Sequence, residues 1–224
     1  MSILGIETAT SVCSVGLANG ESVREVWEEA GRRHSVLLVD LVDRLLDEAE
    51  VKREQLSGVA VSSGPGSFTG LRIGMGLAKG ICMAADLPLL TVSTLEALAV
   101  HSASEATSVC ACLDARHDQL YSGEYARAGA GWDVRLEDAG RSVEDLVKSL
   151  RPDTAVVGFG IDTYASRLIS EGFKVDASVR PSGAAVARVG ARLLEAGQAT
   201  ALESAEPNYC RKSQAERKQD GEDV

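Results

Sequence analysis

The sequence predicts an α/β protein made of two copies of one unit, in which three strands, a helix, a strand and a helix follow one another. Strand-like and helix-like hydrophobic periods alternate along the chain, and this order of elements occurs twice. The composition, 45% hydrophobic and 25% charged over 224 residues, is that of an ordinary globular protein. We therefore expect two domains, residues 1–105 and 106–215, followed by a solvated, disordered tail at 216–224.

The first unit begins with three strand-like segments and a helix. Asn19-Gly20 favours a hairpin between the second and third segments, because both residues tolerate the positive φ angles of a type I′ turn. From His34 the apolar residues follow a helical spacing, with charged residues on the other side. Ser93 and Glu96 form a capping-box pattern before a later helix. Strands are expected at 3–7, 11–18, 21–29, 56–63 and 89–92, and helices at about 34–49, 71–85 and 95–102.

The second unit repeats this order after about residue 106. Its first helix is opened by Ser142, with Asp145 three residues on. Strands are expected at 108–115, 117–127, 132–138, 154–160 and 173–177, and further helices at 161–172 and 182–197. A duplicated β-β-β-α-β-α unit with an RNase H-like core is the plan of the actin-like (ASKHA) superfamily of actin, Hsp70 and sugar kinases. An α/β chain whose elements repeat by chance is the alternative interpretation.

Charge and hydropathy exclude several classes of partner. The chain carries a formal net charge of −10 and both halves are acidic, which argues against a surface that binds nucleic acid or anionic lipid directly. No apolar run reaches the roughly 18 residues that a membrane span needs. The segment MSILGIET has no basic region before its strand-like pattern, so no secretory signal is expected and the predicted compartment is the cytoplasm.

The motifs of common catalytic sites are missing from the sequence. The Gly-rich loop GPGSFTG at 64–70 lacks the lysine of a P-loop, and Thr69 stands where the dinucleotide fingerprint needs a third glycine. His34, His101 and His117 form no pair at metal-ligand spacing. The five cysteines suggest reduced thiols, and Cys110 and Cys112 fall on one face of an apolar strand as core residues. We therefore expect no metal site and no catalytic residues.

Two neighbouring helices suggest a docking surface. Gly70/Gly74 and Gly76/Gly80 are each four residues apart, so stripes without side chains let another backbone approach, either from this chain's own sheet or from a second protein. The preceding helix is rich in Leu and Val. The predicted partner interface comprises His34, Leu38, Leu41, Leu45, Gly70, Leu71, Gly74, Met75, Ala78 and Cys82.

A vestigial nucleotide cleft is the second candidate site. Glu7, Thr8 and Thr10 lie in the first strand-turn, which approaches the phosphates of ATP in the actin-like superfamily. The matching turn of the second unit contains Asp114 followed by Ala115-Arg116, with no glycine to let the backbone approach a phosphate. We therefore do not expect a competent ATP site. The alternative is that Glu7 and Asp114 are ordinary residues at strand ends.

The segments ILGIETATSVCSVGL, SSGPGSFTGLRIGMGLAKG, STLEALA, LDAR and PNYCRKSQAE, with His34-Ser35 opening a helix, resemble the TsaB (YeaZ) family over nearly the whole chain. The resemblance implies a non-catalytic scaffold in bacterial synthesis of threonylcarbamoyladenosine (t6A) at position 37 of tRNA. It further implies that the chain dimerises with TsaD, which carries the metal and the active site, through its first two helices.

The remaining expectations also come from this resemblance. An ATPase, TsaE, is recruited to the pair, and TsaC supplies the threonylcarbamoyl-adenylate. The same surface forms a homodimer when TsaD is absent, tRNA is contacted only through the complex, and ATP or ADP is expected only at the junction with TsaD. Two residues depart from the family pattern, Glu7 where Asp is usual and Asp40 where many members have Pro. A stand-alone ASKHA ATPase or sugar kinase is the first alternative function, and a metallopeptidase, for which metal ligands are missing, is the second.

Overall fold

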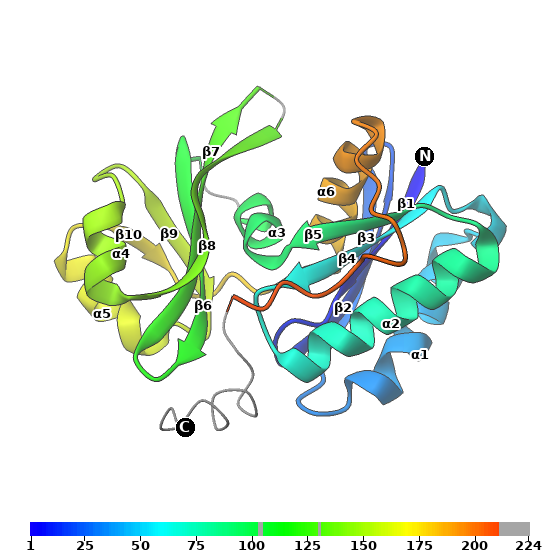
Figure 1. The fold of residues 1–224 in the computed structure, drawn as a ribbon, viewed down its shortest axis with the longest axis horizontal. Coiled ribbons are helices and arrows are strands. Elements are labelled where there is room, and N and C mark those ends of the chain that lie inside the picture. Colours follow the sequence, from blue (N-terminus) through cyan, green and yellow to red (C-terminus); the bar gives the residue numbers. More distant parts are fainter. Residues whose placement is uncertain (103–104, 130, 211–224) are drawn as a thin grey trace.

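The structure, a computed structural model, describes residues 1–102, 105–129 and 131–210, and these residues form two five-stranded sheets (Figure 1). The first sheet has the order β3-β2-β1-β4-β5 and the second the order β8-β7-β6-β9-β10. The strands are β1 (Ser2–Glu7), β2 (Val12–Asn19), β3 (Ser22–Glu29), β4 (Gly58–Gly64), β5 (Leu89–Ser93), β6 (Ser108–Arg116), β7 (Gln119–Ala128), β8 (Gly131–Ser142), β9 (Ala155–Phe159) and β10 (Lys174–Asp176). The expected tail at 216–224 lies outside the described residues.

The two sheets have the same topology, which confirms the duplicated α/β fold. In the first sheet β1 pairs antiparallel with β2 and parallel with β4, and in the second β6 pairs antiparallel with β7 and parallel with β9. The predicted hairpin between β2 and β3 forms, but its turn is one residue further on than expected: Asn19 pairs with Ser22, so Gly20 and Glu21 make the turn. Of these two residues only Gly20 has a positive φ, at +58°, so the expected type I′ turn at Asn19-Gly20 is not formed. This repeated arrangement is the actin-like fold, and it places Glu7 and Asp114 near the ends of equivalent central strands.

The helices follow the predicted order. They are α1 (His34–Ala49), α2 (Phe68–Ala85), α3 (Thr94–His101), α4 (Val143–Ser149), α5 (Asp162–Ser170) and α6 (Gly183–Glu195), with a short 3₁₀ helix η1 (Arg53–Gln55). Helix α2 begins three residues before the expected Leu71, because the Ser67 hydroxyl accepts a hydrogen bond from the Gly70 amide and caps the helix there. No helix among the described residues is long and apolar enough to span a bilayer.

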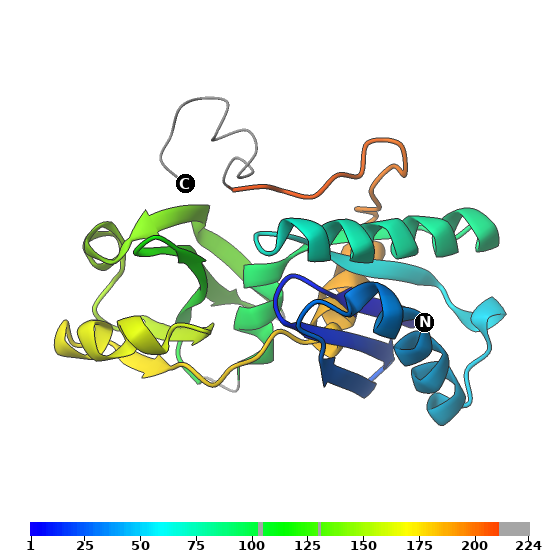
Figure 2. The same cartoon turned by 90° about the horizontal axis from the view of Figure 1, so that it is seen from below.

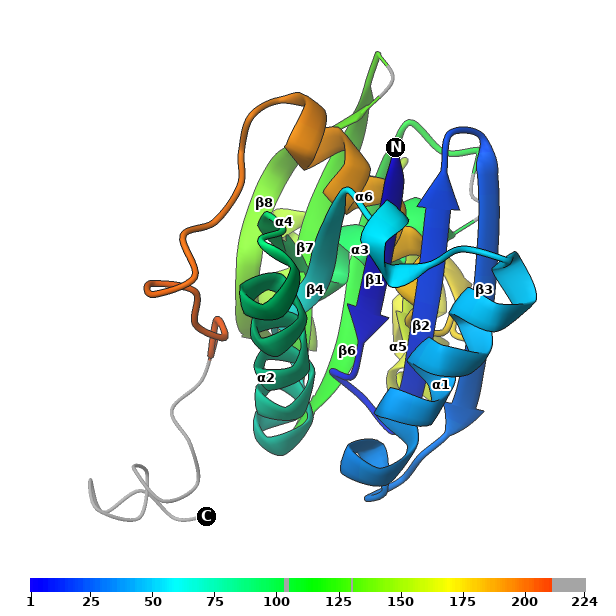
Figure 3. The same ribbon diagram turned by 90° about the vertical axis from the view of Figure 1, so that its right-hand side faces the viewer.

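Two helices are exchanged between the units, which corrects the expected domain boundaries. Helices α1 and α2 cover one face of the first sheet (Figures 2 and 3), but the opposite face is covered by α6, which follows the last strand of the second sheet. There Val186 and Val189 pack with Ile3 of β1. Helix α3 in turn contributes Leu95 and Leu98 to the core of the second sheet. A boundary near residue 105 therefore separates the strands of the two sheets but not their helices.

The contact of α6 with the first sheet is a direct backbone contact. A side chain at Gly5 of β1 would overlap the backbone of Gly183 and Ala187, and one at Gly16 of β2 would overlap Ala184. Glycine is required at these positions because a Cβ atom would push α6 away from the sheet. The amphipathic pattern of 183–195 predicts a helix, but a pattern does not say which of two equivalent sheets it will cover.

Candidate functional site

The end of β1 places the predicted Glu7 inside the protein. Its side chain is fully buried, the Ala9 amide donates to Oε1 at 2.6 Å, and Oε2 has no hydrogen-bond partner among the described residues. Burial away from water raises the pKa of Glu7 to about 7. Thr8 is also buried and donates a hydrogen bond to the Gly70 carbonyl oxygen, while the Thr10 hydroxyl accepts one from the Val12 amide within the turn. These groups hold the first strand-turn together.

The matching turn of the second sheet is built differently. Asp114 is exposed, and its carboxylate accepts a hydrogen bond of 2.8 Å from the Arg116 amide. Arg116, His117 and Asp118 all have φ between 52° and 60°, the left-handed region that favours glycine. The two turns therefore present one buried carboxyl group and one exposed carboxylate rather than a symmetric pair. In the part of the chain that the structure describes, no group of His, Cys, Asp or Glu side chains could hold a metal ion.

The ten residues predicted to contact a partner lie in the core instead, and this corrects their assignment. All of them are buried in the chain itself: His34, Leu38, Leu41, Leu45, Gly70, Leu71, Gly74, Met75, Ala78 and Cys82. The leucines of α1 belong to the same cluster as Val59 and Val61 of the sheet beneath them. A Cβ atom at Gly70 or Gly74 would overlap Thr8. The repeated apolar spacing marks the face of a helix that packs inward, so it selected core residues.

The opposite side of the same helices carries exposed apolar residues. Val36, Val39 and Met83 are 67%, 48% and 74% exposed, and a Cβ atom at Gly76 or Gly80 would meet nothing within 4 Å. We call these five residues the outer α1–α2 face. Leu37, Ile73, Leu77 and Ile81, which are partly buried, pack against the core beside them. The three apolar residues of this face were not predicted from the sequence, although each falls between the core-facing positions of its helix.

The late PNYC segment packs against the Gly-rich loop, so two motifs far apart in the sequence form one unit. The Asn208 amide donates to the Ser63 carbonyl oxygen at 2.6 Å, and a side chain at Gly64 would overlap the Asn208 carbonyl oxygen. The Tyr209 ring centroid lies 4.7 Å from that of Phe68. The segment runs alongside α2, as Figure 2 shows. This arrangement keeps the loop at the start of α2 in place.

Arg72 joins these two aromatic rings. Its guanidinium lies 3.8 Å from the centroid of Phe68, and its Nε donates to the Tyr209 hydroxyl at 2.9 Å. Arg72 and Gly76 are one helical turn apart and both are exposed, so the cluster borders the outer α1–α2 face. We call Phe68, Arg72 and Tyr209 the aromatic clamp.

A second polar cluster connects the two sheets at the start of α3. The Ser93 hydroxyl caps α3 by accepting from the Leu95 and Glu96 amides, and it donates to Asp138 of β8. The Tyr125 hydroxyl donates to the other oxygen of Asp138. The expected capping box is therefore only half formed, because the Glu96 carboxylate pairs with Arg192 of α6 instead of returning to Ser93.

The cysteines behave as core residues, as predicted for Cys110 and Cys112. Both are fully buried on one face of β6, with 3.6 Å between their sulfur atoms. Cys13 and Cys82 are buried as well, and Cys210 is partly exposed. Burial raises the pKa of Cys13 to about 12 and that of Cys82 to about 11, so both remain protonated at neutral pH.

Comparison with known proteins gives consistent matches over the whole chain. The family model for TsaD, tRNA N6-adenosine threonylcarbamoyltransferase, matches residues 26–219. The chain is 32% identical to the tRNA threonylcarbamoyladenosine biosynthesis protein TsaB of Escherichia coli K12, with all of both chains covered. It is 31% identical to TsaB of Bacillus subtilis 168, with 76% of each chain covered.

A threonylcarbamoyltransferase and a solved structure complete the comparison. The transferase of Afipia carboxidovorans is 38% identical, but the match covers 51% of this chain and 34% of that one. The structure of YeaZ from Pseudomonas aeruginosa superposes with a TM-score of 0.83 at 29% identity, covering 93% of this chain and 100% of that chain. Since the full-length matches are to TsaB and YeaZ, the chain belongs to the TsaB (YeaZ) family of tRNA threonylcarbamoyladenosine biosynthesis proteins, which is related to TsaD.

Proposed function

We propose that this chain is a non-catalytic scaffold that pairs with TsaD in bacterial t6A37 synthesis and recruits the TsaE ATPase to the pair. The observation that carries the proposal is the outer α1–α2 face. Val36 and Val39 in the first turns of α1 and Met83 in the last turn of α2 are exposed apolar side chains, and Gly76 and Gly80 of α2 leave open space. Exposed apolar side chains and small residues on a pair of helices favour close packing of a partner's helices, because small residues let the helix axes approach and the apolar groups lose contact with water.

TsaD is the preferred partner because its family model matches this chain over most of its length. We propose that a partner of the same fold presents an equivalent pair of helices, so that four helices pack together. A second copy of this chain would present the same face, which accounts for the expected homodimer in the absence of TsaD. Contact with tRNA is assigned to the complex, since this chain carries a formal net charge of −10.

The non-catalytic assignment is supported by the structure of the two strand-turns, one at the end of β1 and one at the end of β6. Glu7 is enclosed in the protein, with no exposed surface to offer a substrate or a metal ion. Bulky residues Arg116, His117 and Asp118 occupy the tight turn after Asp114 where a phosphate site would need close access to the backbone. We propose that ATP or ADP binds only at the junction with TsaD, which a nucleotide-binding measurement on each protein alone and on the pair would test.

The deciding experiment measures t6A formation on an unmodified tRNA that reads codons beginning with A, using TsaC, TsaD and TsaE with and without this chain. We expect modification only when the chain is present, and no ATP hydrolysis by the chain alone. Equal modification without the chain contradicts the scaffold role. Hydrolysis of ATP by the isolated chain would favour the alternative ATPase or sugar-kinase function.

The surface itself is tested with a substitution that the fold tolerates. Gly80→Arg adds a long charged side chain where there is open space, and Ser166→Arg does the same on the exposed side of α5. We expect Gly80→Arg to abolish pairing with TsaD in sedimentation experiments while Ser166→Arg pairs normally, with neither variant melting below the wild type. Normal pairing of Gly80→Arg would show that the partner binds elsewhere.

A further inference from the structure

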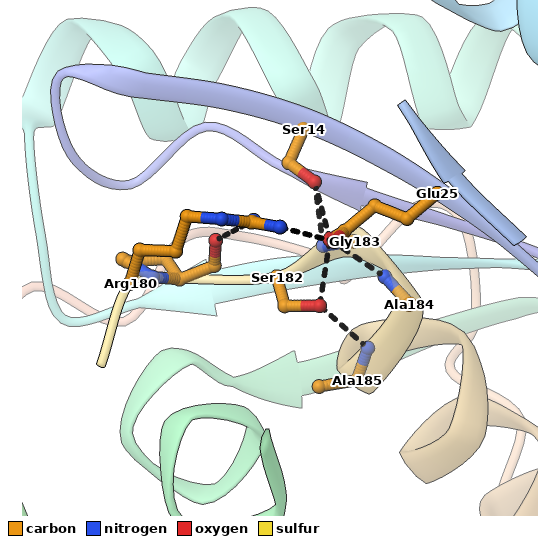
Figure 4. Close-up of polar contacts among 8 residues, drawn as sticks. Ser14, Glu25, Arg180, Ser182, Gly183, Ala184 and Ala185 are labelled. Atoms are coloured by element: carbon orange, nitrogen blue, oxygen red, sulfur yellow. Dashed lines mark hydrogen bonds and ion pairs between the residues drawn. The ribbon is translucent and has the colours of Figure 1, made fainter. Parts of the chain in front are cut away.

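One carboxylate connects the edge of the first sheet to the start of α6 (Figure 4). Glu25 of β3 accepts hydrogen bonds on Oε1 from the hydroxyls of Ser14 at 2.7 Å and Ser182 at 2.6 Å. The Ala184 amide, in the first turn of α6, reaches the same oxygen at 3.4 Å. The guanidinium of Arg180 donates to Oε2 at 2.5 Å. Four groups from three parts of the chain therefore converge on one side chain.

The charge of Glu25 suits this position. The first turn of α6 contains no acidic residue of its own, so the partial positive charge at the helix start is met by a carboxylate from another element. Burial by itself would raise the pKa of Glu25, but the hydrogen bonds from Arg180, Ser182 and Ser14 bring it below the ordinary value. The side chains of Glu25 and Arg180 are only 14% and 23% exposed, which reduces screening by solvent.

Further contacts hold the same place together. The Ser14 hydroxyl, which donates to Glu25, also accepts a hydrogen bond of 2.9 Å from the Gly183 amide. On its outer side, Arg180 lies 4.5 Å from the centroid of the Trp27 ring, two residues along β3 from Glu25. Glu25 on the edge strand β3 therefore contacts both the start of α6 and an arginine that lies on an aromatic ring.

The cluster lies where the chain passes from the second sheet to the helix that covers the first sheet. Residues 177–182 carry the chain from β10 of the second sheet to α6, and α6 packs on the first sheet. The start of α6 is thus one of the places where a movement of the second sheet would reach the first. Because Gly5 and Gly16 bring the α6 backbone into direct contact with the sheet, a small displacement of the helix start would separate that contact.

We propose that Glu25 is a carboxylate latch that holds the 177–182 crossover and the first turn of α6 on the first sheet, and so fixes the two sheets in one relative arrangement. The latch concerns the isolated chain and does not depend on pairing with TsaD. The two hydroxyls, the amide and the guanidinium, which would otherwise be solvated separately, are joined by the carboxylate into one charge-assisted hydrogen-bond network. Without the carboxylate, Arg180, the Ala184 amide and the hydroxyls of Ser14 and Ser182 would lack their shared partner, and the crossover would open locally.

The test compares Glu25→Ala with Glu28→Ala by hydrogen–deuterium exchange. Glu28 lies on the same strand, but its ion pair with Arg44 is at the surface, with both side chains at least 40% exposed. In Glu25→Ala we expect amide exchange over 177–190 to be about 10- to 100-fold faster, the range for loss of hydrogen bonds to a charged group. Exchange in Glu28→Ala should match the wild type. Wild-type rates over 177–190 in Glu25→Ala would overturn the proposal.

Chemical rescue gives an independent readout. Sodium acetate supplies the carboxylate that Glu25→Ala lacks, so it should raise the Tm of this variant in a saturable way above sodium chloride of equal ionic strength. The wild type should show no such difference, and Glu25→Ala/Arg180→Met should lose the response. An equal response in the double variant would overturn the assignment of Arg180 as the partner of the carboxylate.

A conservative variant covers the case in which Glu25→Ala does not fold. Glu25→Gln keeps an oxygen that accepts from Ser14 and Ser182 but removes the charge that faces Arg180. We expect it to fold and to show faster exchange over 177–190 than the wild type. Exchange identical to the wild type would contradict a latch that depends on charge.

Discussion

The Thr8 hydroxyl donates a hydrogen bond of 2.9 Å to the Gly70 carbonyl oxygen, in the space that a side chain at Gly74 would occupy. This contact ties the first strand-turn to the first turns of α2. It explains why glycine recurs on the inner side of this helix although each glycine disfavours the helix itself. The two glycine pairs of α2 therefore have different roles, since Gly76 and Gly80 face open space.

Alanine substitutions at Gly74 and Gly76 should change stability in opposite directions. At Gly74 the new methyl group would overlap Thr8, which cannot turn away without losing its hydrogen bond, so we expect a loss of about 1–3 kcal/mol in the free energy of unfolding. At Gly76 the added Cβ meets nothing, and the better helix propensity of alanine should add about 0.5–1 kcal/mol. Urea unfolding of both variants measures the difference, and equal effects would contradict the assignment of the two glycine stripes.

Glu7→Gln should stabilise the protein at alkaline pH. Burial raises the pKa of Glu7 from 4.5 to about 7, so the folded state binds the proton more tightly than the unfolded state. The free energy of unfolding therefore declines as pH rises from about 4.5 through 7, by an amount on the order of 3 kcal/mol. Glutamine keeps an acceptor for the Ala9 amide without the charge. Unfolding at pH 4.5 and pH 8 should show similar stabilities at the lower pH and a more stable variant at the higher one.

If Glu7→Gln and the wild type differ in their free energy of unfolding by the same amount at pH 4.5 and pH 8, another group controls the pH dependence of stability. Asp138 is the group to examine then, because burial also raises its pKa. Its two carboxylate oxygens accept hydrogen bonds from Ser93 and Tyr125, so Asp138→Asn, measured over the same range, separates the two contributions.

The sequence was sufficient to predict which elements form and in what order, because hydrophobic period and turn residues act locally. The hairpin between β2 and β3, the helix from His34 and the strand containing Cys110 and Cys112 all follow from neighbouring residues. The exchange of α3 and α6 between the sheets could not be predicted in this way. Two equivalent sheets offer equivalent apolar faces, and only long-range contacts such as Gly5 with Gly183 distinguish them.

The candidate site was less accessible to sequence reasoning for the same physical reason. A helical apolar stripe reports the side that is buried on folding, so it led to Leu38 and Leu41 and not to Val36 and Val39. An exposed valine has no local signature that separates it from a core valine. The convergence of Ser14, Ser182 and Arg180 on Glu25 includes a hydrogen bond between residues 157 positions apart, Ser182 and Glu25, and neither spacing nor residue type indicates it.

Thiol chemistry should distinguish Cys210 from the other cysteines. Cys13, Cys82, Cys110 and Cys112 are buried, whereas Cys210 is partly exposed, although burial still raises its pKa to about 11. We expect a disulfide reagent at pH 8 to modify one thiol per native chain, slowly, and all five after unfolding. In Cys210→Ser the native reaction should disappear. Fast reaction of two or more thiols in the folded protein would mean that the core opens in solution.

The aromatic clamp should control the mobility of the Gly-rich loop. Tyr209→Ala removes the ring that lies against Phe68 and the hydroxyl that accepts from Arg72. The 206–210 segment then keeps the backbone bond from Asn208 to Ser63 and the bond from the Cys210 thiol to the Asp138 carbonyl oxygen. Since an exposed cation–π contact contributes about 0.5–1 kcal/mol, we expect a modest loss of global stability. The larger effect should be local, with faster amide exchange at 63–70. Tyr209→Phe, which keeps the ring, is the matched control and should retain most of the protection. If both variants exchange like the wild type at 63–70, the segment does not restrain the loop, and the joint presence of the two motifs needs another explanation.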